Sequence, residues 1–382
     1  MNAYPIYLDY NATTPCDPQV LEAMFPFFSQ HFGNAASKAH AHGWYAEEAV
    51  DRAREQVASL IGASASEIIF TSGATESVNL AIQGYAERNA AKGKHIITIA
   101  TEHKAVLDTC EYLSSKGYSI TKVPVDSFGM IDLSQLEASI QKDTLLIAAM
   151  YANNETGVIF PVKEVGRIAR DKGVAFFCDA TQAVGKVPVD VIQDNIDLMA
   201  FSGHKMYGPK GVGTLYVRKK DPMVEIASLF YGGGHERKMR SGTLNVPGIV
   251  GLGKAAEICQ LSMKEDAIRL YDLREQFWNG IKDIPGVKWN GDKGHSLSHV
   301  ANICFDIPGG DNLIRVLSKY MSVSSGSACS SATVSPSHVL KAMGLSDQQA
   351  LSSIRFSLGR KSSAAEIKIV VEVLSKALQR MQ

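Results

Sequence analysis

Short apolar runs alternate with helix-like segments through the first two-thirds of the chain, and this alternation constrains the fold more than any other feature. The apolar runs show little polar alternation and are bounded by turn residues, as in strands that are buried on both faces. The runs are 68–70, 95–100, 145–150, 174–178 and 198–201, and the helix-like segments include 44–61, 75–91 and 162–172. This order predicts an α/β fold, with a mostly parallel sheet flanked by helices and ligands at the carboxyl ends of the strands.

The length of the chain and its second half predict two domains. With 382 residues the chain exceeds what one hydrophobic core usually organises. Residues 211–218 resemble a further strand near the sheet edge, and a long helical stretch over about 249–281 leads away from the sheet. An apolar strand at 300–307, a helix after Asp311 and a final helix from about Ala364 predict a smaller α+β domain. We place the large domain at 15–255, and the small domain at 1–14 and 256–382.

Charge and cysteine content argue against several classes of function. Lys plus Arg equals Asp plus Glu, at 39 each, so no global field favours nucleic acid or an anionic membrane as a partner. The six cysteines show no C-x-x-C spacing, so neither a disulfide framework nor a metal site is expected. The N-terminus lacks the features of a secretory signal, and the apolar runs are too short to span a bilayer. A reducing, cytoplasmic location fits this pattern best.

Three predicted strand ends carry residues that fit one cofactor chemistry. Residues 71–76 open a helix with small and hydroxyl side chains, and the free N–H groups of such a helix start suit a phosphate. Asp179 follows one strand, and Lys205 follows the next. Taken singly, a helix cap by Ser72 or Thr75, a capping carboxylate and a solvated lysine are the more ordinary interpretations. Together they supply the phosphate cradle, the acid and the Schiff-base amine that pyridoxal 5'-phosphate requires.

The sequence resembles the cysteine desulfurases of the NifS and IscS type, which are class-V aminotransferase-like members of the fold-type-I pyridoxal-phosphate enzymes. The motifs that carry this resemblance run in order across nearly the whole chain. They are YLDYNATTP at 7–15, FTSGATES at 70–77, TEH at 101–103, ANNETG at 152–157, CDATQ at 178–182, SGHK at 202–205, RSGT at 240–243 and SGSAC at 325–329. No single motif is decisive, but jointly they are highly specific.

The resemblance implies roles for the residues around the cofactor. Lys205 would bind pyridoxal 5'-phosphate as a Schiff base and act as a base, and Asp179 would keep the pyridine nitrogen protonated. Gln182 would hydrogen-bond the ring hydroxyl oxygen, with Asn154 nearby. His103 would stack on the ring and assist proton transfer, although a capping or core histidine is the ordinary alternative. The phosphate would be held by Ala74, Thr75, Ser202 and His204, and by Thr243 from the neighbouring subunit.

The resemblance also implies a substrate and partners. Arg355, with Asn154, would hold the carboxylate of L-cysteine, because arginine binds carboxylates in a bidentate way. The position of Thr243 implies a homodimer with shared active sites. A sulfur-acceptor or scaffold protein is expected, and its identity is left open. The iron–sulfur-cluster type usually carries a further tail that docks the scaffold, whereas this chain stops at Gln382, so docking to a scaffold is left open as well.

Cys329 differs from the other five cysteines in its surroundings. It lies in the serine-rich stretch 322–337, among Ser, Gly and Ala. A mobile loop of this composition would let a thiol react inside a pocket and then present its cargo outside. The resemblance implies that the Cys329 thiolate attacks the substrate sulfur, so that a persulfide forms on Cys329 and alanine is released. The other cysteines lie in contexts where a small buried hydrophobe is the default, or, for Cys16, in an undefined one.

Other activities stay open at this point. Selenocysteine lyase activity is the nearest alternative, because both substrates share one carbon skeleton. An aminotransferase of the same fold would not need Cys329, and a non-catalytic sulfur carrier would not need Lys205, Asp179 and Gln182. One departure from the family pattern, Ala35 in place of a frequent proline, leaves the chemistry unchanged.

Overall fold

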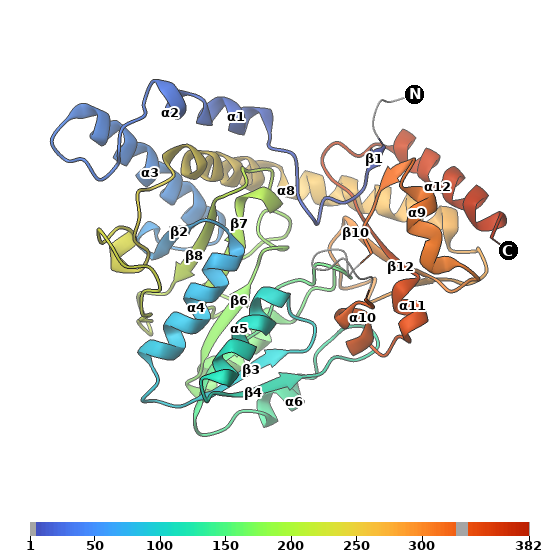
Figure 1. The fold of residues 1–382 in the computed structure, drawn as a ribbon, viewed down its shortest axis with the longest axis horizontal. Helices are drawn as coiled ribbons and strands as arrows, with labels where there is room; N and C mark the ends of the chain where they lie inside the picture. The colour runs from blue at the N-terminus through green and yellow to red at the C-terminus, as the bar shows by residue number, and fades with distance from the viewer. Residues whose placement is uncertain (1–4, 326–334, 382) are drawn as a thin grey trace.

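The computed structural model describes residues 5–325 and 335–381. A seven-stranded sheet forms the centre of its larger part (Figure 1). The strand order is β2-β8-β7-β6-β5-β3-β4, with β2 at Ile68–Thr71, β3 at His95–Ile99, β4 at Ser119–Val123, β5 at Thr144–Ala148, β6 at Ala175–Asp179, β7 at Leu198–Ser202 and β8 at Gly213–Val217. The pairs from β4 to β7 are parallel, whereas β8 is antiparallel to both of its neighbours. The predicted mostly parallel sheet is therefore confirmed.

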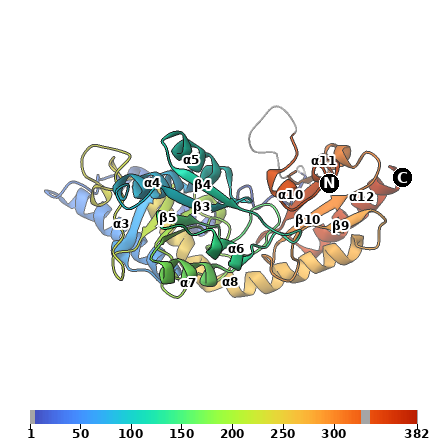
Figure 2. The ribbon, with the colours of Figure 1, turned by 90° about the horizontal axis from the view of Figure 1, so that it is seen from below.

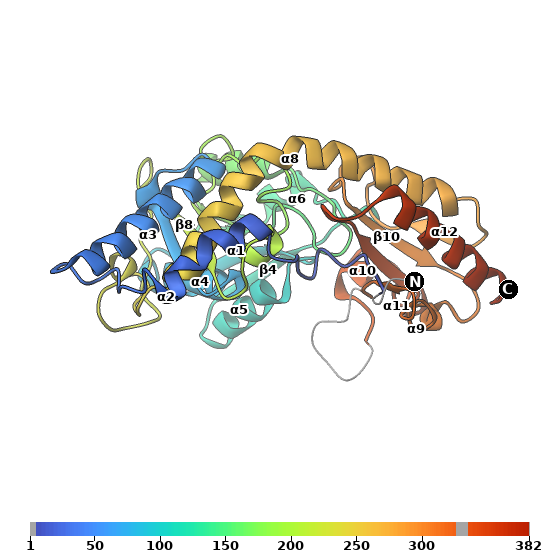
Figure 3. The same ribbon diagram turned by 90° about the horizontal axis from the view of Figure 1, so that it is seen from above.

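Both faces of the sheet are buried, as the apolar runs predicted. Successive residues of one strand belong to different hydrophobic clusters, because side chains alternate between the faces: Phe176 belongs to one cluster and Phe177 to another. The face of Phe176 is covered by α3 (Ala41–Leu60), α6 (Leu133–Ala138), α7 (Val162–Lys172) and the first half of α8 (Val246–Ile281). The face of Phe177 is covered by α4 (Ala74–Arg88) and α5 (Lys104–Ser115). Figures 2 and 3 show the two helix layers from opposite sides.

The helix α8 is 36 residues long and joins the two parts of the molecule (Figure 3). Its first half packs on α3 and on α1 (Pro18–Met24), which is followed by α2 (Pro26–Ser29). Its second half packs on α12 (Ala364–Gln379). The expected division at residues 255 and 256 falls inside this helix. That boundary stays a prediction.

The smaller part is built on an antiparallel sheet of order β12-β10-β9, with β9 at Val287–Trp289, β10 at Val300–Phe305 and β12 at Ser353–Ser357. A separate hydrophobic cluster joins this sheet to α8 and α12, and it includes Phe277, Phe305 and Phe356. Leu8 from the N-terminal segment belongs to the same cluster. The remaining elements are β1 (Ile6–Tyr7) paired with β11 (Met321–Ser322), α9 (Leu313–Leu317), α10 (His338–Ala342), α11 (Asp347–Leu351), and the 3₁₀ turns η1 (Ala65–Glu67), η2 (Gly203–Lys205), η3 (Glu236–Lys238) and η4 (Gly310–Asn312).

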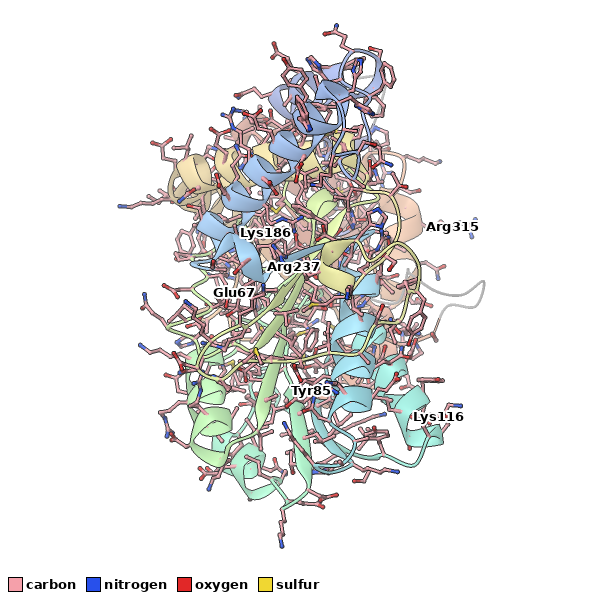
Figure 4. All side chains as sticks on the ribbon, turned by 90° about the vertical axis from the view of Figure 1, so that its left-hand side faces the viewer. Glu67, Tyr85, Lys116, Lys186, Arg237 and Arg315 are labelled. Carbon is pink, nitrogen blue, oxygen red and sulfur yellow. The ribbon has the colours of Figure 1, made fainter. Side chains whose placement is uncertain are left out.

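Side chains form hydrogen bonds with the backbone N–H and C=O groups on the outer edge of β2, where a further strand would otherwise pair. Glu236 accepts hydrogen bonds from Phe70 N (2.7 Å) and from the guanidinium of Arg54. Arg54 and Arg237 both donate to the carbonyl oxygen of Ile68. Arg237 is labelled beside this edge in Figure 4. These contacts hold residues 236–240 against the sheet, only a few residues before Thr243.

Within residues 5–325 and 335–381, no helix combines the length and apolar character needed to cross a membrane.

Candidate active site

One cavity of about 460 Å3 lies at the carboxyl ends of the central strands, where the α/β pattern predicted ligands to collect. Its walls come from the segments that follow β2, β3, β5, β6 and β7, together with Asn11 and Ala12 from the N-terminal segment. Ten of the residues expected at the cofactor or substrate line it: Ala74, Thr75, His103, Asn154, Asp179, Gln182, Ser202, His204, Lys205 and Arg355. The structure therefore brings these residues together, and their individual roles stay predictions.

Lys205 lies in η2, directly after β7, and its amine reaches across the cavity floor to the N-terminal segment. Its Nζ donates to the carbonyl oxygens of Asn11 (2.5 Å) and Ala12 (2.7 Å). The same segment is fixed to the lysine turn by Thr14, whose N–H and hydroxyl both donate to the carbonyl oxygen of His204 at 2.9 Å. The amine is therefore inside the cavity and held in a defined position.

Asn11 is a residue that the sequence analysis quoted within a motif without giving it a role. It is 1% exposed, and all its polar groups are used. Its carbonyl oxygen accepts from Lys205 and from Gln182 Nε2 (3.1 Å), and its Nδ2 donates to Asn154 O (3.0 Å). Its Oδ1 accepts from His299 Nε2 (2.9 Å). The only sequence signal for this hub was its place in the motif at 7–15.

Two acidic side chains lie together under the cavity. Asp179, the last residue of β6, is 6% exposed, and its Oδ1 accepts from Thr181 N at 3.0 Å. Glu102 is fully buried, and its Oε1 accepts from Met150 N at 2.6 Å. Burial, and then the charge of Asp179, raise the pKa of Glu102 well above its ordinary value. Glu102 therefore favours its neutral form.

The side of the cavity formed by α4 has the features of an anion site. Gly73 is the N-cap of α4 and no side chain caps the helix, so the ordinary alternative, a cap by Ser72 or Thr75, is wrong. The first N–H groups of α4 therefore point out of the helix without intrahelical partners. A Cβ at Gly213 would lie 2.6 Å from Gly73 Cα, so only glycine lets β8 approach this closely. Burial and the neighbouring lysines Lys205 and Lys210 lower the pKa of His204 to about 4, so His204 is neutral at neutral pH.

His103 both lines the cavity and caps a helix. It is the N-cap of α5, where its Nδ1 accepts from Ala105 N at 3.1 Å. Because Nδ1 accepts a hydrogen bond, Nε2 carries the proton of the neutral ring. The capping alternative and the placement in the cavity are therefore both correct for this residue.

Arg355 lies on β12, and its side chain is 5% exposed. Its Nη2 donates to Asp9 Oδ1 (2.6 Å), and its Nη1 donates to Asn154 O (2.9 Å). Its Nε is buried and has no hydrogen-bond partner among the described residues. The guanidinium is thus fixed at the cavity wall by two of its five N–H groups.

Two expected site residues are not placed in the cavity. Thr243 is exposed and does not line the cavity. Arg240, three residues earlier, forms an ion pair at 2.7 Å with Glu76 of α4, which does line it. Cys329 lies outside the described residues.

Thr181 lines the cavity although the sequence analysis assigned it no role. Its buried Oγ1 has no partner within the described part of the chain. Within the described residues, no group of three or more His, Cys, Asp or Glu side chains is placed to hold a metal ion.

The family model for class-V aminotransferases matches residues 6–370 of the chain. The chain is 52% identical over 379 residues to "Cysteine desulfurase IscS" of Anaeromyxobacter sp. (strain K), an alignment that covers 99% of this chain and 93% of that protein. It is also 52% identical over 380 residues to the protein of the same name from Escherichia coli O139:H28, covering 99% and 94% of the two chains.

Solved structures share the fold. A "NifS-like protein" superposes with a TM-score of 0.90 at 40% identity, covering 98% of this chain and 99% of that chain. A structure described as "SspA in complex with cysteine" superposes with a TM-score of 0.82 at 38% identity, covering 92% and 98% of the two chains. The fold-type-I architecture expected from the sequence is therefore confirmed.

Proposed function

Because the chain belongs to the class-V aminotransferase family, we propose that it is a pyridoxal-phosphate-dependent cysteine desulfurase. It converts L-cysteine to L-alanine and supplies the sulfur for iron–sulfur clusters or other sulfur-containing products. The single observation that carries this proposal is the convergence of Lys205, Asp179 and Gln182 in one cavity of a chain that is 52% identical to cysteine desulfurases over nearly its full length.

The cavity fits pyridoxal 5'-phosphate. The uncapped start of α4, with Ala74, Thr75, Ser202 and neutral His204 beside it, suits a phosphate dianion. Thr181 Oγ1 is buried without a partner in the described residues, so a polar group in the cavity would satisfy it. Asp179 lines the same cavity and is the acid that would pair with a protonated ring nitrogen. Bound there, the cofactor supplies an electron sink for negative charge at the substrate Cα.

The residues of the chain would then perform the following steps. Lys205 anchors the cofactor and, once released by the substrate amine, takes the proton from the substrate Cα. His103, with its proton on Nε2, faces the same space and moves a proton to or from the reacting groups. Arg355 lines the cavity and holds the substrate carboxylate with guanidinium N–H groups that Asp9 and Asn154 do not use.

Sulfur transfer would end on Cys329. Its thiolate attacks the sulfur of L-cysteine, the bond from sulfur to Cβ breaks, and the electron pair of that bond stays on the carbon fragment. That carbon takes a proton, so the products are L-alanine and a persulfide on Cys329. Atoms and charge balance without an external oxidant. This role rests on the sequence motif, because Cys329 lies outside the described residues.

The experiment is incubation of the holoenzyme with L-cysteine, followed by quantification of alanine and mass analysis of the peptide that contains Cys329. One added sulfur on that peptide and one alanine per sulfur are expected. A parallel incubation with a keto acid tests the aminotransferase alternative, and one with selenocysteine compares the two lyase substrates. Amino-group exchange without release of alanine from cysteine would overturn the proposal.

We also propose a homodimer with shared active sites. Thr243 is exposed on its own subunit, and the segment that precedes it carries two exposed aromatic residues, Phe230 and Tyr231. Exposed apolar side chains of this kind favour burial against another chain. A second copy could therefore receive Thr243 at its phosphate site.

Mixed dimers test this arrangement sharply. Lys205→Ala subunits and Thr243→Val subunits are each purified with low activity and then combined under conditions that exchange subunits. If Thr243 serves the partner's site, one of the two sites in a mixed dimer has both wild-type residues, and activity reappears. If Thr243 serves its own subunit, neither site is complete, and mixing restores nothing.

The protein that receives the sulfur is proposed to be an acceptor or scaffold protein, and a cytoplasmic location is proposed for the enzyme. The location is supported by five cysteines that are free thiols in the described part of the chain, as expected in a reducing compartment. Mass analysis of candidate acceptors after incubation with the persulfide-loaded enzyme identifies the recipient.

A further inference from the structure

A second lysine, Lys186, lies behind the cavity. It is in the turn that follows β6, and its Nζ donates to Gln182 Oε1 at 2.7 Å. It does not line the cofactor cavity but a small separate one of about 30 Å3, together with His299 and Arg360. The two cavities share no lining residue. Figure 4 labels Lys186 well inside the outline of the molecule. The Gln182 side chain therefore lies between this amine and the cofactor cavity.

The backbone at Lys186 keeps the lysine in this place. The preceding residue, Gly185, has φ +77°, a conformation that L side chains rarely adopt. A Cβ at Gly185 would also lie 2.8 Å from Cys259 Sγ of α8. Lys186 N donates to Ala183 O at 2.9 Å, which closes the turn. The turn is thus packed tightly against α8, and the Lys186 side chain runs back toward Gln182.

The contacts with Lys186 and with the carbonyl oxygen of Asn11 together determine the orientation of the Gln182 amide. A lysine amine offers only donors when charged, so its partner on Gln182 is the carbonyl oxygen Oε1. The Nε2 group is then the end that donates to Asn11 O at 3.1 Å, and its second hydrogen stays available on the cavity side. With the opposite orientation, Gln182 would present an oxygen to the anionic ring oxygen of the cofactor.

We propose that Lys186 is a positioning residue: by holding Oε1 of Gln182, it keeps the amide N–H of Gln182 directed at the ring hydroxyl oxygen of pyridoxal 5'-phosphate. The inference deepens the proposed function and rests on it.

The charged groups near the Lys186 amine are Lys205 and Arg355 on the cofactor side, with Asp266 and Arg360 around the small cavity. Burial, and then repulsion from Lys205, lower the pKa of Lys186 to about 7, and an amine of either charge still has N–H groups to donate.

A fixed donor on the ring oxygen has a spectroscopic consequence. Bound through Lys205, the cofactor would supply a visible absorbance that depends on whether the Lys205 nitrogen beside the ring oxygen carries a proton. A hydrogen bond from Gln182 Nε2 would stabilise the negative charge on the same ring oxygen. The nitrogen would then lose its proton at a lower pH. Removing the support of Lys186 weakens this hydrogen bond. The pH midpoint of the visible band should therefore rise.

The experiment compares pH titrations of the visible absorbance of the holoenzymes. Lys186→Met should raise the midpoint by about one pH unit, the size expected for loss of one charge-assisted hydrogen bond. Lys186→Arg, which keeps a donor, should stay within a few tenths of a unit of the parent, about the level of a weak surface effect. The matched control is Lys172→Met, since Lys172 is an exposed lysine on α7 that pairs with Glu137, and it should leave the midpoint unchanged.

A double variant tests whether Lys186 acts on the cofactor through Gln182. In Gln182→Leu, adding Lys186→Met should produce less than about a third of the shift seen in the parent, because the two residues act in series. An equal shift in both backgrounds, or no shift in Lys186→Met holoenzyme, would overturn the inference. If Lys186→Met does not give folded holoenzyme, Lys186→Leu, which also lacks a donor, replaces it with the same two outcomes. Failure of the proposed function is seen separately, as a parent protein that has no visible band or makes no alanine.

Discussion

Lys205 Nζ lies 2.5 Å from the carbonyl oxygen of Asn11, a residue 194 positions away in the chain. The N-terminal segment therefore closes the floor of a cavity whose other walls come from the central sheet. Through Asn11 it also reaches Asn154 and His299, so the position of the amine depends on both parts of the molecule.

Replacement of Lys205 by alanine should remove the covalent attachment of the cofactor and the base for the substrate proton. We expect the rate of alanine formation to fall by at least about a thousandfold, since a positioned base alone contributes hundreds to thousands. Absorbance and an alanine assay measure the two effects. Lys172→Ala on the exposed surface is the control and should match the parent. A Lys205→Ala enzyme with near-parental turnover would refute the assignment.

Replacement of Cys329 by serine should separate cofactor binding from sulfur transfer. The variant should keep the visible absorbance of the holoenzyme, because no expected cofactor contact is lost. We expect no persulfide at position 329 and less than about a hundredth of the parental alanine formation, since the sulfur lacks its nucleophile. Cys16→Ser serves as the matched control. The role of Cys329 is wrong if its serine variant still desulfurates cysteine at the parental rate.

Asn11→Ala should destabilise the protein through buried groups that lose their partners. The side chain of Asn11 accepts from the buried His299 and donates to the carbonyl oxygen of the partly buried Asn154. Loss of one buried and one partly buried hydrogen bond predicts a decrease of about 2 to 4 kcal/mol in the free energy of unfolding. Chemical unfolding of the apo proteins measures it. A decrease below about 0.5 kcal/mol, typical of surface sites, would show that the hub does not act as inferred.

Glu155 should make stability depend on pH. It is 3% exposed, accepts from Ser337 Oγ at 2.5 Å, and burial raises its pKa from 4.5 to about 7. Because the folded pKa lies above the unfolded one, its contribution is fully present below about pH 4.5 and is lost as the pH rises through about 7. Glu155→Gln cannot ionise and escapes this loss.

The difference in unfolding free energy between Glu155→Gln and the parent should therefore shift in favour of the variant by about 2 to 3 kcal/mol between about pH 5 and about pH 8. Denaturant titrations at the two pH values measure it. Glu225→Gln, in an exposed pair with Arg88, is the control and should show almost no such shift. A constant difference for Glu155→Gln would mean that Glu155 is already ionised in the folded protein near pH 5.

The sequence predicted the central sheet and most of the cavity, because both depend on local signals. Alternation of apolar runs and helical periodicity locates strands such as β6 and β7, and parallel strands bring their carboxyl ends to one edge. Asp179 ends β6 and Lys205 follows β7, so the two residues had to approach each other. The limits of α7 at Val162–Lys172 were also predicted.

What the sequence alone determined is thus the set of reactive groups at the strand ends. The tertiary structure decided what surrounds them. The edge strand β4 has exposed and intermediate residues, so its apolar pattern was too weak to identify. Asn11 and Lys186 acquire their positions only when distant segments pack together, since a backbone carbonyl or a buried amine leaves no local pattern. Hydrogen bonds across about 190 residues depend on how the two parts of the molecule meet, and no short-range propensity encodes that.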